Sequence, residues 1–183
     1  MDLVFVTSNQ NKAQEVKHIL GIEIETAGLD LPELQSLRVD EVAKTKVKTA
    51  YGIVKRPVIV EDTGIYIKSF AGFPGALAKW FVNGLGYEAA CRSVDVSKDR
   101  GAYAETCVAF YDGKILKTFT GRIYGKIAHK PRGAGNFGWD KIFIPNGYKK
   151  TFAEMTMEQK AKISMRSVAV RKLGKFLKSK EIR

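Results

Sequence analysis

Two adjacent carboxylates follow an apolar run in the first half of the chain. Val58-Ile59-Val60 is β-branched and typical of a buried strand, and it leads directly into Glu61-Asp62-Thr63-Gly64. Carboxylates at the end of a buried strand are costly unless they have a partner. The stretch therefore indicates a site, although Asp-Thr-Gly is also good turn chemistry and would suit an ordinary exit from a strand.

A second candidate lies near the start of the chain. Leu3-Val4-Phe5-Val6 predicts a strand, Thr7-Ser8-Asn9 a turn, and the apolar spacing after it a helix with Asn9 as N-cap. Lys12 then falls in the first helical turn, where a cation fits the helix dipole poorly unless an anion is bound there. A phosphate would account for it, and capping alone remains the alternative.

Glycines alternate with large aromatic residues between Gly133 and Asp140. Such a loop suits a planar ligand, because backbone can approach closely at glycine while a ring stacks on the ligand. The alternative is a loop whose aromatic side chains, Phe137 and Trp139, pack into the core.

Charged residues on three further elements complete the candidates. Glu33 follows Asp30-Leu31-Pro32 and is expected on a loop. Thr156-Met157-Glu158-Gln159 has capping-box spacing, so a short helix carrying Lys160 should begin there. Ser164 is expected to cap a second helix with Arg166 in its first turn, and a break at Ser164 would let the two cations converge.

The remaining pattern predicts the elements that position these residues. Residues 22–26 alternate like a strand, 40–54 have one apolar helical face, and Ile65-Tyr66-Ile67 is expected to be a separate strand after the carboxylates. A helix is expected over 76–85, with Leu77, Trp80 and Phe81 as its apolar stripe, and a short one over 87–94. Residues 102–111 and 115–127 flank Asp112-Gly113, a strong hairpin signal.

The composition is that of one globular domain. The 183 residues are 45% hydrophobic and 27% charged, which suits a single core and excludes a disordered chain. The sequence holds no apolar run near the roughly 20 residues that cross a bilayer, and its start resembles no signal peptide, so we expect a cytoplasmic protein without a membrane partner. Cys91 and Cys107 lack metal-site spacing and are expected to be buried thiols.

The positive charge lies in the last third of the chain. Residues 1–113 contain 13 Lys and Arg against 15 Asp and Glu, whereas residues 114–183 contain 18 against 4. An anionic partner is implied, either a nucleic-acid backbone or a compact polyphosphate. A solvated lysine-rich surface is the third explanation.

Taken together, the candidates suit a nucleoside triphosphate. Carboxylates from different elements are typical ligands of a Mg²⁺ ion that also binds phosphates, the cations would hold the phosphates, and the glycine-aromatic loop a base. No Ser-His-Asp or Cys-His arrangement is evident, so attack by water is the natural chemistry. A basic nucleic-acid-binding domain and a nucleotide-binding regulator without turnover are the alternatives.

The chain resembles the inosine/xanthosine triphosphate pyrophosphatases, the Ham1-like non-canonical purine NTP pyrophosphatases. The resemblance runs nearly end to end. It is carried by these motifs in order: Thr7-Ser8-Asn9 with Lys12, Asp30-Leu31-Pro32-Glu33, Val60-Glu61-Asp62-Thr63-Gly64, Pro74-Gly75, Phe137-Gly138-Trp139-Asp140, Thr151-Phe152-Ala153-Glu154-Met155, and Lys160 with Ser164-Met165-Arg166.

The resemblance implies an α/β fold with an elongated mixed sheet, in which two lobes surround a cleft and the second lobe covers about 66–130. It implies a homodimer that hydrolyses ITP, dITP and XTP to the monophosphate and pyrophosphate. Glu33 and Asp62 would bind Mg²⁺, and Asp62 would be the general base. The expected substrate contacts are Thr7, Ser8, Asn9, Lys12, Lys46, Thr63, Phe137, Gly138, Trp139, Asp140, Lys160 and Arg166. One departure is Met165, where the family usually has histidine, so that histidine's role does not carry over.

Overall fold

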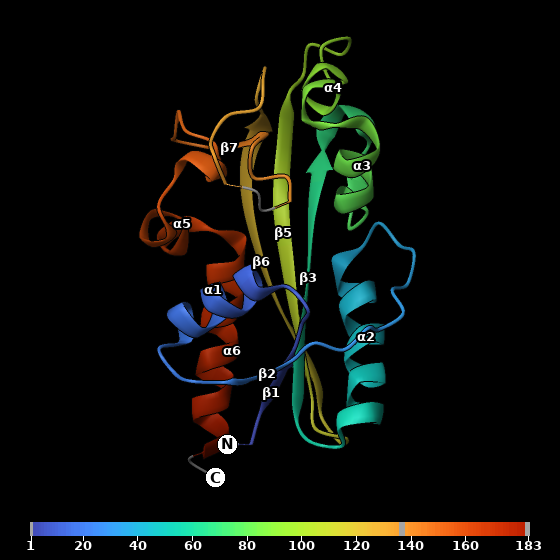
Figure 1. Ribbon diagram of the computed structural model, residues 1–183, viewed down its shortest axis with the longest axis vertical. Helices are drawn as coiled ribbons and strands as arrows, with labels where there is room; N and C mark the ends of the chain where they lie inside the picture. The colour runs from blue at the N-terminus through green and yellow to red at the C-terminus, as the bar shows by residue number, and fades with distance from the viewer. Residues whose placement is uncertain (1, 136–137, 182–183) are drawn as a thin grey trace.

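One mixed sheet of seven strands runs through the computed structural model, which describes residues 2–135 and 138–181 (Figure 1). The strand order is β2-β1-β3-β5-β6-β7, with β4 paired to β3. β1 is parallel to β2 and β3, and the other pairs are antiparallel. The strands are β1 Val4–Val6, β2 Glu25–Ala27, β3 Val58–Ile67, β4 Pro74–Gly75, β5 Gly101–Tyr111, β6 Leu116–Ile127 and β7 Phe143–Pro145. The expected elongated mixed α/β fold is confirmed.

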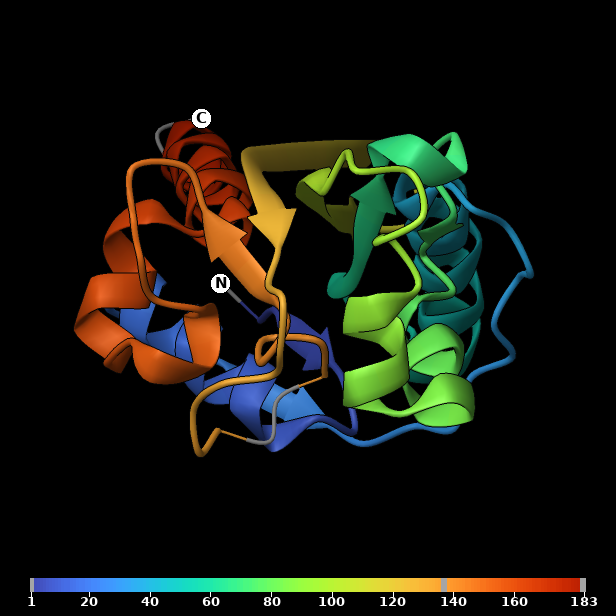
Figure 2. The same cartoon turned by 90° about the horizontal axis from the view of Figure 1, so that it is seen from above.

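Helices cover both faces of the sheet. They are α1 Gln10–Leu20, α2 Val39–Val54, α3 Ala78–Leu85, α4 Tyr87–Arg92, α5 Met157–Ile163 and α6 Met165–Glu181, with 3₁₀ turns at Lys68–Phe70 and Phe152–Glu154. α2 packs on one face of the lower half of the sheet, and α1 and α6 pack on the other (Figure 1). α3 and α4 pack on that second face in the upper half, seen from above in Figure 2.

Several local predictions are confirmed. Asp112 accepts hydrogen bonds from the N–H groups of Lys114 and Ile115, at 3.0 and 2.7 Å, and so closes the turn between β5 and β6. The helix expected over 40–54 is α2, that over 76–85 is α3, and that over 87–94 is the shorter α4. Cys91 and Cys107 are free and buried.

Three predictions about elements are wrong. The strand expected over 22–26 is the shorter β2 at Glu25–Ala27, which starts three residues later and ends one residue later. The strand at Val58 does not stop at the carboxylates, because β5 pairs with every residue from Val58 to Ile67 and holds them in one strand. Trp80 does not belong to the buried stripe of α3; its side chain is 68% exposed, while Phe81 is buried.

Among the helices of the described residues, none combines the length and the apolar character that a bilayer span requires.

Candidate active site at the open edge of strand β3

The carboxylates Glu61 and Asp62 lie where β3 has a strand on only one side. β1 pairs with β3 at Val58 and Ile59, and β4 pairs with it at Ile65 and Tyr66. Among the pairings of the described residues, none covers this edge of β3 between those two points. β1 ends beside the gap, and the crevice at the carboxyl end of a parallel strand is a common ligand site in α/β folds.

Gly64 lets β4 approach β3 closely at the end of this gap. A Cβ atom at Gly64 would lie 2.5 Å from the carbonyl oxygen of Gly75, which is far inside van der Waals contact. Gly75 itself has φ +56, and a Cβ there would lie 2.2 Å from the Leu37 carbonyl oxygen. Packing therefore requires glycine at both Gly64 and Gly75, because a larger residue at either position would overlap the neighbouring backbone.

The turn between β1 and α1 brings Lys12 into the gap. Thr7 Oγ1 accepts from the Asn9 N–H at 3.1 Å, and Asn9 Oδ1 accepts from the Lys12 N–H at 3.2 Å, which confirms Asn9 as N-cap. Ser8 is exposed beside them. Lys12 Nζ donates to the Glu61 carbonyl oxygen at 3.5 Å and lies 3.3 Å from Glu61 Oε1. The first turn of α1 thus places backbone N–H groups of a helix N-terminus and the Lys12 ammonium group beside the gap.

Asp62 faces the α2 side of the sheet, with Val60 and Tyr66. Its side chain is buried, and Oδ2 has no hydrogen-bond partner. Burial raises the pKa of the Asp62 carboxyl to about 7, and the negative charge of Glu33 adds to this rise, although Lys12 and Lys46 oppose it. A carboxyl group with this pKa can accept a proton near neutral pH.

Glu33 reaches the same place from the loop 28–38 and forms an ion pair with Lys46 of α2. Burial raises the pKa of Glu33, but Lys46, Lys12 and Lys79 lower it more, so its carboxyl stays ionised. The charges of Lys12, Lys46 and Glu33 therefore all act on the Asp62 carboxyl. These four residues come from four separate elements, and the sequence predicted that they would meet at one site.

The donor set at Asp62 and Glu33 fits Mg²⁺. The unpartnered Oδ2 of Asp62 is a buried oxygen in need of a ligand. In the part of the chain that the structure describes, no group of three or more His, Cys, Asp and Glu side chains forms a complete metal cage. Mg²⁺ does not need one, because it commonly takes one or two carboxylates together with waters and substrate phosphates.

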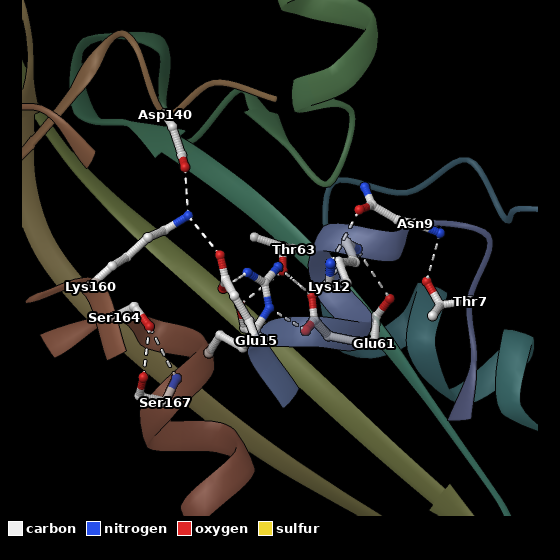
Figure 3. A network of polar contacts seen from close by, with 12 residues as sticks. Thr7, Asn9, Lys12, Glu15, Glu61, Thr63, Asp140, Lys160, Ser164 and Ser167 are labelled. Atoms are coloured by element: carbon white, nitrogen blue, oxygen red, sulfur yellow. Dashed lines mark hydrogen bonds and ion pairs between the residues drawn. The ribbon is translucent and has the colours of Figure 1, made fainter. Parts of the chain in front are cut away.

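A buried ion network occupies the opposite face of β3 (Figure 3). Arg166 is wholly buried and donates to both carboxylate oxygens of Glu61, at 2.5 and 2.9 Å. It also pairs with Glu15 of α1. Thr63 Oγ1 donates to Glu61 at 2.7 Å and bonds with Thr106 Oγ1 at 2.8 Å. Burial opposes ionisation of Glu61, but Arg166 and Lys12 outweigh it and hold its pKa far below the usual range.

Lys160 joins the same network from α5. Its Nζ donates to Glu15 Oε1 at 3.0 Å and to Asp140 Oδ2 at 2.5 Å. Thr156 begins α5 with the expected capping box, and Ser164 Oγ accepts from the Ser167 N–H at the start of α6. The break at Ser164 does bring Lys160 and Arg166 together, because both contact Glu15. Asp140 Oδ1 is buried without a hydrogen-bond partner, and burial raises the pKa of this carboxyl.

Within the described residues of the glycine-aromatic loop, the ring of Trp139 has too little exposed surface for stacking. Trp139 is only 6% exposed and packs edge-on against Phe143, with ring centroids 5.7 Å apart. For Trp139, the core-packed alternative therefore holds. The Gly138 carbonyl accepts from Tyr87 Oη at 2.8 Å. Phe137, the other expected ring, lies outside the described residues.

Two residues of the site were not among the sequence candidates. Glu15 contacts both buried cations and lies one turn after Lys12 on α1, so its spacing from Lys12 was an available signal. Lys79 acts on the pKa of Glu33 from the first turn of α3. Like Lys12, it is a cation at the end of a helix where the dipole disfavours one.

Comparisons with known proteins show the family of this chain. The model of the Ham1 family matches residues 3–176. The chain belongs to the Ham1 family. The resemblance indicated by the sequence motifs is thus confirmed.

Two relatives and one solved structure illustrate the family relationship. A Schizosaccharomyces pombe protein named inosine triphosphate pyrophosphatase is 42% identical over 183 residues, covering 98% of this chain and 96% of its own. A Thermococcus kodakarensis protein named dITP/XTP pyrophosphatase is 39% identical over 181 residues, covering 97% of this chain and 98% of its own. The structure of the Staphylococcus aureus Ham1 protein superposes with a TM-score of 0.81 at 26% identity, covering 97% of this chain and 99% of that one.

Proposed function

We propose that this protein is an enzyme that hydrolyses the non-canonical purine nucleoside triphosphates ITP, dITP and XTP to the nucleoside monophosphate and pyrophosphate, and so removes them from the nucleotide pool. The observation that carries the proposal is the buried Asp62 carboxyl at the open edge of β3. It has an unpartnered oxygen and a pKa of about 7, and cations from two helices act on it. The names of the two relatives support the same substrates and products.

Asp62 is the proposed general base. It accepts a proton from the attacking water. The water oxygen bonds to the α-phosphorus, while the bond from that phosphorus to the oxygen bridging to the β-phosphate breaks and pyrophosphate leaves. Its buried position raises the pKa to about 7, so near neutral pH a large share of the group is in the basic form, and the protonated form can release its proton afterwards. Mg²⁺ held by Glu33 and Asp62 supplies charge neutralisation for the phosphates when it is bound.

The triphosphate is proposed to bind along the start of α1 and the facing lysines. Thr7, Ser8 and Asn9 offer hydroxyl, amide and backbone N–H groups at a helix N-terminus, which favours anions. The ammonium groups of Lys12 and Lys46 act on Asp62 and Glu33, and Lys79 acts on Glu33. Charge that develops on the phosphates would be stabilised by these fixed cations.

The nucleoside is proposed to bind beside the buried network, at Thr63, Phe137, Gly138, Trp139, Asp140, Lys160 and Arg166. The paired carboxylates Glu15, Glu61 and Asp140 fix the two cations in place. A 6-oxo purine presents an acceptor where adenine presents a donor, so a site with fixed cationic donors favours hypoxanthine and xanthine over adenine. Met165 is fully buried and contributes only apolar contact.

We also propose the compartment, the domain organisation and the assembly of the enzyme. Two buried free thiols suit a reducing compartment, and we propose the cytoplasm. We propose a single domain in which the segment 66–130 forms the second lobe, and a homodimer as the working assembly.

Pyrophosphate release from ITP, dITP, XTP, ATP and GTP, measured with and without Mg²⁺, tests the activity. We expect Mg²⁺-dependent release from the first three and little from ATP and GTP. Equal rates on all five would contradict the substrate class. Salt-sensitive nucleic-acid binding without any turnover would favour the nucleic-acid alternative instead.

A further inference from the structure

Tyr87, the first residue of α4, contacts a loop that lies far along the chain. Its Oη donates to the carbonyl oxygen of Gly138 at 2.8 Å. Gly86, with φ +78, ends α3 and begins α4, so the two helices meet directly before Tyr87. α4 lies at the end of the molecule away from both chain termini (Figure 1). A side chain of the upper half is therefore tied to the segment proposed to bind the nucleoside.

Gly138 depends on this bond for its position. It is exposed, and a Cβ atom there would meet no atom within 4 Å. Among the described residues, no second hydrogen-bond partner of Gly138 is found. Trp139 and Asp140, by contrast, are buried, and the Asp140 carboxylate accepts from Lys160. The Tyr87 hydroxyl therefore fixes Gly138, whereas the next two residues are fixed without it.

The helix that carries Tyr87 is itself well anchored. Cys91 of α4 is fully buried in the core of the upper half. Arg100 donates to the carbonyl oxygen of Cys91 at 2.6 Å and to that of Ala128 at 2.6 Å, which ties the end of α4 to the segment after β6. Lys141 Nζ lies 5.2 Å from the centre of the Tyr87 ring, where a cation is attracted to the ring face. The Tyr87 hydroxyl is thus carried by a fixed ring on a fixed helix.

We propose that Tyr87 is a positioning residue for the purine nucleoside, and that its hydroxyl holds the Gly138 backbone in the place where the nucleoside binds. This role rests on the proposed function, because Gly138 is one of the nucleoside contacts proposed there. A hydrogen bond that orders the backbone before the nucleotide arrives removes part of the ordering cost of binding. Among the described residues, no hydrogen bond or ring contact joins Tyr87 to the start of α1. The effect is therefore confined to the nucleoside end of the nucleotide.

Tyr87→Phe tests this role, because it removes the hydroxyl and keeps the ring beside Lys141. We expect the KM for ITP to rise roughly two- to tenfold, as for the loss of one hydrogen bond, with kcat unchanged, because the nucleoside is held equally in the ground and transition states. Calorimetry should show that inosine monophosphate binds more weakly by a similar factor. Inorganic triphosphate has no nucleoside, so it should inhibit the wild type and the variant equally.

Tyr111→Phe is the matched control. Tyr111 Oη donates to the carbonyl oxygen of Gly113 at 3.1 Å, in the turn between β5 and β6. The substitution therefore removes the same kind of hydrogen bond, from a tyrosine to a loop glycine, at a place away from the nucleoside. It should leave the KM, the affinity for inosine monophosphate and the inhibition by triphosphate unchanged.

Unchanged KM and unchanged affinity for inosine monophosphate in Tyr87→Phe would overturn the role of Tyr87 and leave the proposed function intact. Equal weakening of inosine monophosphate and triphosphate would also overturn it, because a general effect on the fold moves both. A wild type that binds inosine monophosphate but does not hydrolyse ITP would overturn the proposed function instead. The affinity of Tyr87→Phe for inosine monophosphate then decides on Tyr87 by itself, since this binding needs no turnover.

Discussion

Glu61 and Asp62 are consecutive residues of β3, and their carboxylates lie on opposite faces of the sheet. Glu61 is held by Arg166 on the α6 side, while Asp62 faces Lys46 on the α2 side. The two pKa values move in opposite directions, down for Glu61 and up to about 7 for Asp62. One carboxylate is therefore a permanent partner for a buried cation, and the other is available for protons and metal.

Glu61→Gln should destabilise the protein strongly. The substitution leaves the buried guanidinium of Arg166 with only part of its countercharge, and breaking a buried ion pair from one side typically costs about 3–5 kcal/mol. The remaining Glu15 contact puts the expected loss near the lower limit. Urea unfolding measures it. Glu23→Gln, which breaks the exposed pair with Lys17, is the control and should have little effect; equal losses in both would refute the role of the buried network.

Glu33→Gln should raise the Mg²⁺ concentration needed for half-maximal pyrophosphate release by at least roughly tenfold, because one of two carboxylate ligands becomes a neutral amide. Titration of Mg²⁺ at saturating ITP measures the shift. Glu41→Gln, an exposed carboxylate at the start of α2, is the control. An unchanged Mg²⁺ dependence in Glu33→Gln would remove Glu33 from the metal site.

Asp62→Asn should make the metal-free protein more stable than the wild type above about pH 7. In the folded wild type the pKa of Asp62 is raised by burial, so its contribution to stability is complete below the unfolded pKa near 4 and is lost as the pH rises toward 7. The loss is at most about 1.4 kcal/mol per pH unit in this window. Unfolding in EDTA at several pH values measures the difference between the two proteins, and a difference that does not change between pH 4 and 7 would contradict the raised pKa.

Gly64→Ala should separate β3 from β4 and destabilise the fold by about 1–3 kcal/mol, because the added Cβ overlaps the backbone of Gly75. Gly84→Ala in α3 meets no atom within 4 Å and should be neutral or stabilising, since alanine favours a helix. Thermal melts of the two variants test the comparison. A Gly64→Ala protein as stable as Gly84→Ala would show that the close approach at the gap is not needed.

Local signals in the sequence predicted local structure well. Asn9, Thr156 and Ser164 cap the helices that their side chains suggested, and Asp112-Gly113 forms the expected hairpin turn. Each of these depends on hydrogen bonds between residues two or three positions apart. The convergence of Lys160 and Arg166 followed from the same type of signal, because a cap at Ser164 requires a break between two helices.

The errors come from contacts between distant residues. The strand at Glu61 continues because β5, more than forty residues later, pairs with it along its whole length. The partners of Glu15 are 145 and 151 residues away, so its spacing from Lys12 on α1 did not show which cations it would pair with. The burial of the Trp139 ring also depends on such contacts, because it packs in a core cluster with residues of β3, α3 and α6. Sequence spacing does not show which face of a distant element a side chain will meet.

The account depends most on Asp62, and the turnover of ITP by Asp62→Asn tests it directly. With saturating Mg²⁺, we predict a loss of pyrophosphate release of about 10²–10⁴-fold, in a variant that remains folded by circular dichroism. Asp2→Asn changes an exposed acid that pairs with Arg56 before the start of β3, and it should keep full activity. Wild-type turnover in Asp62→Asn would contradict the assignment of this carboxylate as the base, and with it the proposed chemistry of the open edge of β3.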